Sequence, residues 1–142
     1  MAASPETAPT QGVETVLQVL GGKWKVLILW HLLSTTLRYG ALRRLMPDIT
    51  EKMLIRQLRE LERDGIIARI SYPSVPPRVE YRMTTYGHSL SPILDALCHW
   101  GWCHLQHQQA GLRSERAGGT NLRASDSESV PGVVVQSEMP NS

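Results

Sequence analysis

The segment from residue 50 to residue 64 carries four cationic side chains at intervals of three and four positions: Lys52, Arg56, Arg59 and Arg63. On a helix this spacing places all four in one stripe about 60° wide. Three leucines fall on the opposite side: Leu54, Leu58 and Leu61. Ammonium and guanidinium groups in a row suit the binding of nucleic-acid phosphates, and an arginine can also form paired hydrogen bonds to a base edge.

The same helix also contains acids, which offer a simpler interpretation. Glu60 lies within reach of Arg56 and Arg63, and Glu62 lies within reach of Arg59. A solvated helix that neutralises its own charges is therefore the alternative. The neighbouring segments decide between the two, because a short helix and a turn precede this helix and a proline-rich hairpin follows it. We interpret residues 50–64 as a recognition helix for the major groove.

The order of the expected elements supports this interpretation. Thr50 is a good N-cap for the recognition helix, and Gly65 stands where a helix ends. Alternating apolar residues on both sides of a short connection predict the hairpin. The expected elements are helices over 13–20, 23–33, 40–46 and 50–64, an extended piece over 37–39, strands over 68–72 and 78–84, and a last helix from Ser89 or Ser91. The predicted fold is mainly α with a small β-hairpin (α+β), a winged helix-turn-helix with N- and C-terminal dimerisation helices.

The docking of such a helix assigns roles to its residues. Its N-terminal half approaches base edges and its later residues meet the backbone. The candidates for base contact are Thr50, Lys52, Met53, Arg56 and Gln57, and the candidates for phosphate contact are Arg59 and Arg63. Paired hydrogen bonds would let Gln57 read adenine and Arg56 read guanine.

The connection between the two strands is the predicted wing, residues 73–78. Three prolines stiffen it, because their φ angles are fixed. Arg78 stands at its base and is a candidate for the minor groove, where narrow A·T tracts attract arginine. The alternative is that Arg78 pairs with Glu80 or stays in water.

The composition of the chain indicates its domain boundaries and its cellular compartment. The chain has 142 residues and a net charge of only +2. Residues 12–107 hold 12 Lys and Arg against 8 Asp and Glu, and we expect them to form the winged domain. Residues 1–11 are expected to be mobile, and residues 108–142 to be a disordered tail. We expect no signal peptide, and the longest apolar stretch, Val26–Leu33, is too short to span a membrane. A cytoplasmic protein is therefore expected.

The remaining reactive side chains give weaker indications of a catalytic, metal-binding or thiol site. No set of nucleophile, base and orienting residue is evident, so we expect neither an enzyme nor a cofactor. His99, Cys103 and His107 share one stripe of the last helix, and Cys98 is expected to be a small buried side chain. A metal- or thiol-responsive sensor on this helix is an alternative, although structural zinc sites usually have four ligands. A pocket for a small effector among the tryptophans is another alternative.

Several short sequences resemble those of the HxlR-type winged helix-turn-helix regulators. They are Gly21-Gly22-Lys23-Trp24, Arg38-Tyr39-Gly40-x-Leu42, Met53-Leu54, Gln57-Leu58-Arg59-Glu60-Leu61-Glu62-x-Asp64-Gly65 and Tyr72-Pro73-x-Val75-Pro76-Pro77-Arg78-Val79-Glu80-Tyr81. The last is the most specific, since it covers strand, wing tip and returning strand. The resemblance implies a bacterial or archaeal dimeric transcription regulator, more often a repressor. Apolar stripes left over on the first and last helices independently predict a homodimer.

The chain also departs from that family. Redox-responsive members carry their sensing cysteine in a Cys-Pro pair just before the first helix, where this chain has Gln11 and Gly12. Ala41 replaces a residue that is usually acidic, and Thr85-Tyr86 replaces a more common Pro-Leu. Thiol sensing at the usual position is thus excluded. A winged-helix module that binds another protein instead of DNA is the remaining alternative.

Overall fold

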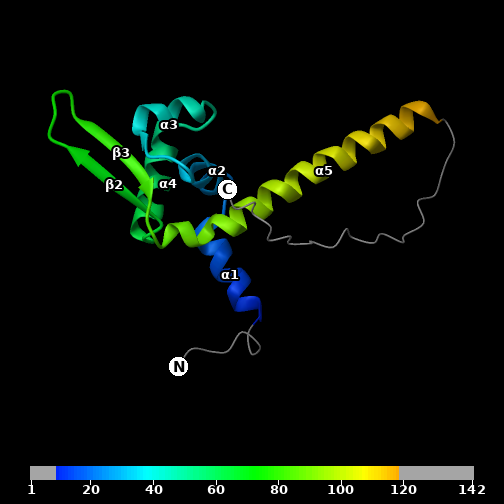
Figure 1. Ribbon diagram of the computed structural model, residues 1–142, viewed down its shortest axis with the longest axis horizontal. Coiled ribbons are helices and arrows are strands. Elements are labelled where there is room, and N and C mark those ends of the chain that lie inside the picture. The colour runs from blue at the N-terminus through cyan, green and yellow to red at the C-terminus, as the bar shows by residue number, and fades with distance from the viewer. Residues whose placement is uncertain (1–8, 119–142) are drawn as a thin grey trace, which may run out of the picture. The chain divides into compact units, whose positions relative to one another are not determined.

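The computed structural model describes residues 9–118. Its helices and strands follow the predicted order (Figure 1). They are α1 Pro9–Leu20, α2 Trp24–Leu32, β1 Leu37–Arg38, α3 Tyr39–Leu45, α4 Glu51–Arg63, β2 Ile67–Tyr72, β3 Arg78–Met83, a 3-10 turn Gly87–Leu90, and α5 Ser91–Ala117. The prediction of a mainly helical winged helix-turn-helix is confirmed. By its internal contacts the chain divides into two units, residues 1–102 and 103–142, each described by itself.

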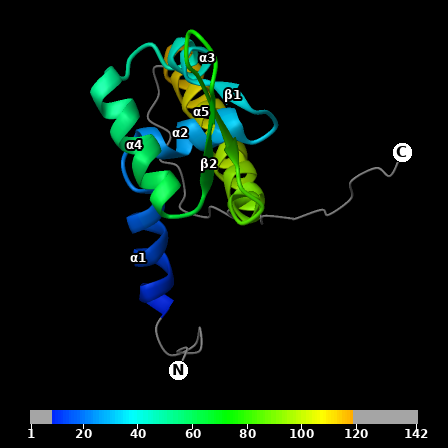
Figure 2. The ribbon, with the colours of Figure 1, turned by 90° about the vertical axis from the view of Figure 1, so that its left-hand side faces the viewer.

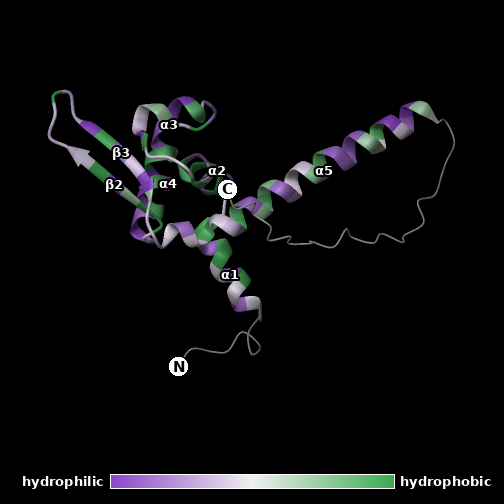
Figure 3. Ribbon diagram, in the orientation of Figure 1, coloured by the Kyte–Doolittle hydropathy of each residue, from purple (hydrophilic) through white to green (hydrophobic). Residues whose placement is uncertain are grey.

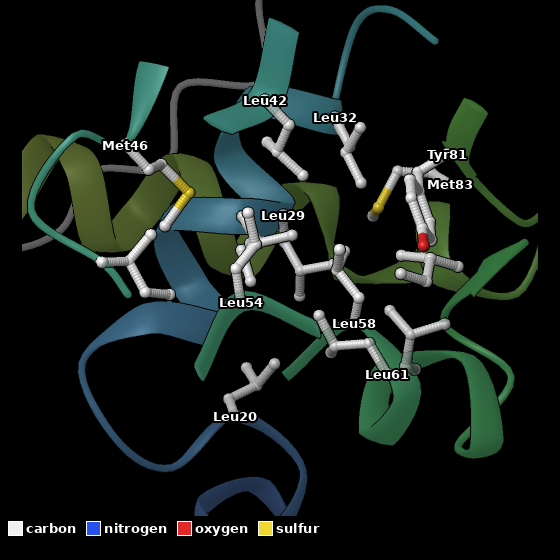
Figure 4. Close-up of a cluster of buried hydrophobic side chains, with 14 of the residues drawn as sticks. Leu20, Leu29, Leu32, Leu42, Met46, Leu54, Leu58, Leu61, Tyr81 and Met83 are labelled. Carbon is white, nitrogen blue, oxygen red and sulfur yellow. The ribbon is translucent and has the colours of Figure 1, made fainter. Parts of the chain in front are cut away.

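The core of the first unit forms around α2. Ile28, Leu29 and Leu32 have almost no exposed surface, as expected for a helix that is apolar on nearly every side. The leucines of α4 pack against this helix and the sheet closes the cluster, as Figure 4 shows. The buried apolar residues of the cluster are Leu20, Ile28, Leu29, Leu32, Leu42, Met46, Ile49, Leu54, Leu58, Leu61, Ile66, Ile67, Tyr81, Met83 and Leu94.

The helix-turn-helix consists of α3 and α4. Thr50 begins α4 as predicted, because its side-chain oxygen accepts a hydrogen bond from the backbone N–H of Met53 at 3.2 Å. After Asp64 the chain leaves the helix at Gly65, whose φ of +75° favours glycine. The predicted N-cap and C-terminal stop of the recognition helix are both confirmed.

The sheet has three antiparallel strands in the order β1-β3-β2. The β2-β3 hairpin was predicted, and the short β1 pairs with the outer side of β3, with Leu37 opposite Tyr81. The wing tip, residues 73–77, is exposed throughout. Figure 2 shows α4 beside the hairpin. The helix contacts the hairpin directly, through strand β2.

A compact junction joins α4 to the hairpin. The Thr84 hydroxyl donates to the carbonyl oxygen of Gly65 at 2.6 Å and accepts from the backbone N–H of Gly87 at 2.9 Å. A β-carbon on Gly87 would lie 2.0 Å from the carbonyl oxygen of Ile66, so only glycine fits there. The base of the wing is therefore fixed to the end of the recognition helix.

Both terminal helices are longer than predicted. α1 begins at Pro9, so residues 9–11 are helical, while residues 1–8 lie outside the described residues. α5 continues to Ala117, so residues 108–117, which we had assigned to the tail, are also helical. Glutamine, leucine and arginine in this stretch favour a helix, and the low apolar content that suggested disorder does not oppose one. The rest of the predicted tail, residues 119–142, is outside the described residues.

Apolar side chains remain exposed on both terminal helices. On α1 they are Val13, Val16 and Leu17, and on α5 they are Ile93, Leu97, Trp100, Trp102, Leu105 and Leu112. Figure 3 shows hydrophobic residues recurring along each of these helices. Within residues 9–118, no helix combines the length and the apolar character needed to cross a membrane.

Candidate nucleic-acid interface

The exposed face of α4 presents the predicted stripe of cations. Its four members, Lys52, Arg56, Arg59 and Arg63, are all exposed. The leucines opposite them are at most 1% exposed. Burial of those leucines fixes the rotation of the helix about its axis, and this rotation directs the four cations toward solvent.

Two of the four cations have an acidic neighbour. The Nε of Arg56 lies 3.3 Å from Oε1 of Glu60, and the Nε of Arg63 lies 3.7 Å from Oδ1 of Asp64. Both arginines stay more than two-thirds exposed, at 70% and 74% of their side chains. Within residues 9–118, no carboxylate oxygen approaches Lys52 or Arg59 within 4.0 Å. The internal pairing that the acids suggested is thus only partial, and the stripe keeps a positive surface.

The other predicted residues of α4 take part in local contacts. Thr50 caps the helix, and Met53 is half-buried against the core. The side-chain amide of Gln57 donates to the sulfur of Met53 at 3.5 Å. Helical spacing places these three residues outside the stripe of cations, toward the side that packs on the core. A base contact by Gln57 would have to replace its contact with Met53.

Arg78 makes the contact that we considered as the alternative. Its guanidinium group binds the Glu80 carboxylate, with Nε 2.8 Å from Oε1, and stacks 4.4 Å from the centre of the Tyr72 ring. The side chain is 39% exposed. Arg78 therefore stiffens the wing from within, and a minor-groove contact by this residue stays a prediction.

A hollow of about 770 Å³ separates the recognition helix from the wing. Four arginines from four different elements line it: Arg38 of β1, Arg44 of α3, Arg59 of α4 and Arg69 of β2. Of these, only Arg59 was a predicted site residue. The others lie on short or apolar segments, and only the fold brings them together. Glu51 and Glu62 of α4 line the hollow as well, so four arginines against two glutamates leave an excess of positive charge, which suits an anionic strand.

A buried ion pair that the sequence did not reveal lies beneath the stripe. The Nζ of Lys25, on α2, lies 2.6 Å from Oε2 of Glu60, and the Lys25 side chain is only 7% exposed. Glu60 therefore contacts a core lysine with one oxygen and Arg56 with the other. The available signal was a lysine in the middle of an apolar helix, which must find a partner if it is buried.

This ion pair predicts an acid-sensitive contribution to stability. The hydrogen bond from Lys25 is the main cause that lowers the pKa of Glu60 below its ordinary value of 4.5, and it outweighs the opposite effect of burial. The contribution is complete above about pH 4.5 and is lost as the pH falls through the lowered pKa. Urea unfolding between pH 3 and pH 7 measures it. In the K25M/E60Q double variant this part of the pH dependence should disappear; an unchanged profile would contradict the assignment.

The cysteines and histidines of α5 show no clear site. Cys98 and Cys103 are both exposed, so our expectation that Cys98 is buried was wrong. Its edge position on the apolar stripe does not bring it against the core. Within residues 9–118, no three ligand side chains come together as a metal ion would need. A metal- or thiol-responsive sensor on this helix stays a prediction.

Comparison with known proteins identifies relatives over most of this domain. Residues 19–109 match the family model described as HxlR-like helix-turn-helix. An uncharacterized HTH-type transcriptional regulator of Bacillus subtilis (strain 168), YtcD, is 58% identical over 93 residues, which are 66% of this chain and 74% of YtcD. An uncharacterized HTH-type transcriptional regulator of Methanothermobacter thermautotrophicus is 52% identical over 97 residues, covering 68% of this chain and 74% of the relative.

Solved structures agree with the sequence matches. The crystal structure of ytcD has a TM-score of 0.64 and 56% identity, covering 66% of this chain and 96% of that chain. The redox regulator HypR in its reduced form has a TM-score of 0.66 and 42% identity, covering 70% of this chain and 98% of that chain.

Proposed function

The chain belongs to the HxlR-like helix-turn-helix family and is a DNA-binding transcription regulator, and from this premise we propose that it is a repressor that reads its operator with α4 in the major groove. One observation supports this geometry most directly. The stripe of Lys52, Arg56, Arg59 and Arg63 is exposed on the side of α4 opposite the buried leucines. Positive charge and helix shape together match the groove.

The position of each side chain along α4 suggests its role. The N-terminal half of the helix, which reads bases in this docking, contributes Thr50, Lys52, Met53, Arg56 and Gln57. Arg59 and Arg63 follow along the same face and are assigned to phosphates. Arg59 also lines the hollow between α4 and the wing, so a backbone strand lying there would meet it together with Arg38, Arg44 and Arg69. Arg78 would reach the minor groove from the base of the wing.

We further propose that the protein works as a homodimer in the cytoplasm, where bacterial and archaeal DNA lies. The exposed apolar side chains of α1 and α5 support this, because a lone chain would leave them in water. Two-fold pairing would place the two α4 helices about 34 Å apart, one turn of DNA, on a nearly palindromic site. Sedimentation of the purified protein measures the assembly directly.

Selection of operators from random duplexes, followed by fluorescence anisotropy over a salt series, tests DNA binding. We expect log K to fall linearly with log salt concentration. R63A should weaken binding to all duplexes alike and lower the salt slope by about 1, because one phosphate contact is lost.

R113A is the matched control, since it removes an arginine from α5 and should leave the slope unchanged. Absence of duplex binding at low ionic strength would overturn the proposal. It would favour a winged-helix module that binds a protein partner.

A further inference from the structure

The buried ion pair between Lys25 and Glu60 lies directly beneath Arg56. Glu60 divides its carboxylate, with Oε2 held 2.6 Å from the Lys25 ammonium and Oε1 placed 3.3 Å from the Nε of Arg56. Exposure falls steeply inward along this row, from 70% at Arg56 to 24% at Glu60 and 7% at Lys25. The three charged groups thus form a short row from the surface of α4 to α2.

The net charge of this row depends on Lys25. Two cations and one anion leave a net charge of +1, and its exposed end is Arg56. Without the lysine, Arg56 and Glu60 would cancel. The Arg56 guanidinium would also interact more strongly with a carboxylate that has no other counter-ion, since the partly buried position of Glu60 weakens solvent screening. The same arginine would then attract DNA less.

We propose that Lys25 is a positioning residue for DNA binding: by neutralising Glu60 from inside the domain, it leaves the charge and the outer N–H donors of Arg56 available to DNA. The inference rests on the proposed function, because it concerns a residue of the proposed interface. Lys25 is buried on α2 and does not contact Arg56, so its effect on DNA affinity is transmitted through Glu60. A lysine that only joins α2 to α4 would not act through the charge of Glu60.

The test compares charge variants by anisotropy over a salt series on one selected duplex. K25M keeps a side chain of similar length without its charge, and we expect roughly tenfold weaker binding and a salt slope smaller by about 0.9. K25M/E60Q removes both charges and restores a net +1 at Arg56, so its affinity and slope should return to those of the unchanged protein. K25R retains the buried cation and should keep the original slope.

Two controls separate this effect from folding and from overall charge. K23M removes an exposed lysine near the same helix, which contacts the Trp24 ring rather than Glu60, and should not change the slope. Thermal unfolding checks that each variant is folded at the assay temperature. If K25M is not, K25Q replaces it, because glutamine can donate a hydrogen bond to Glu60 without a charge.

The outcomes are distinct. A smaller salt slope and weaker binding in K25M, both restored in K25M/E60Q, support the inference. A folded K25M with the original slope overturns it, as does a double variant that binds as weakly as K25M, since Lys25 would then act through packing alone. An unchanged protein that binds no duplex overturns the proposed function itself.

Discussion

Replacement of Leu58 by alanine lowers the free energy of unfolding by about 2–5 kcal/mol, a large share of the stability of a small domain. Leu58 is 1% exposed and belongs to the row of leucines with which α4 packs against the core (Figure 4). Its truncation removes buried apolar surface and leaves a cavity between helices that cannot close fully. Urea unfolding followed by circular dichroism, at one fixed protein concentration, measures the change.

Leu45 provides the matched control on the neighbouring helix. Its side chain is 50% exposed at the end of α3, and L45A should cost less than about 1 kcal/mol. Equal losses in L45A and L58A would mean that the buried face of α4 is not where the structure places it. The rotation of the recognition helix, and with it the direction of the cations, would then be wrong.

Replacement of Arg56 by alanine weakens binding to the selected operator by about 1–3 kcal/mol and relaxes the preference at one base pair. Arg56 is the arginine of the N-terminal half of α4 and is 70% exposed. The Lys25–Glu60 pair remains in this variant, so the fold should persist and the loss should reflect DNA contacts. Anisotropy with the operator and with duplexes changed one position at a time measures both effects.

R56K separates charge from geometry. Lysine keeps the cation but not the planar fork, so we expect the salt slope of the unchanged protein together with reduced discrimination at the same base pair. If R56A binds the operator and the altered duplexes as the unchanged protein does, Arg56 does not contact a base.

Local sequence patterns predicted the elements of this fold well. The intervals of cations and leucines over residues 50–64 located α4 and both of its faces, and Thr50 and Gly65 marked its ends. Alternation located the hairpin. These features depend on residues close together in the chain. The length of α5 was missed, since low apolar content lowers the expectation of packing but does not prevent a helix.

The candidate site was harder to predict from the sequence, because much of it depends on contacts between residues that are distant in sequence. The Lys25–Glu60 pair joins α2 to α4, and no pattern within either segment identifies its partner. The same holds for Arg38, Arg44 and Arg69, which only the packing of α3 and the sheet brings to one hollow. The pairing of Arg78 with Glu80 lies within one strand, and the sequence did suggest it.

The junction at Gly65 and Thr84 has a consequence for how an operator is chosen. Because hydrogen bonds tie the hairpin to the end of α4, the separation between α4 and the wing, the two parts that we propose contact DNA, is set before any duplex binds. A duplex must therefore supply two grooves at that separation, or bend and twist until it does. The energy of this deformation differs between flexible and stiff base steps. Base pairs that no side chain touches should consequently influence affinity, through the mechanics of the DNA itself.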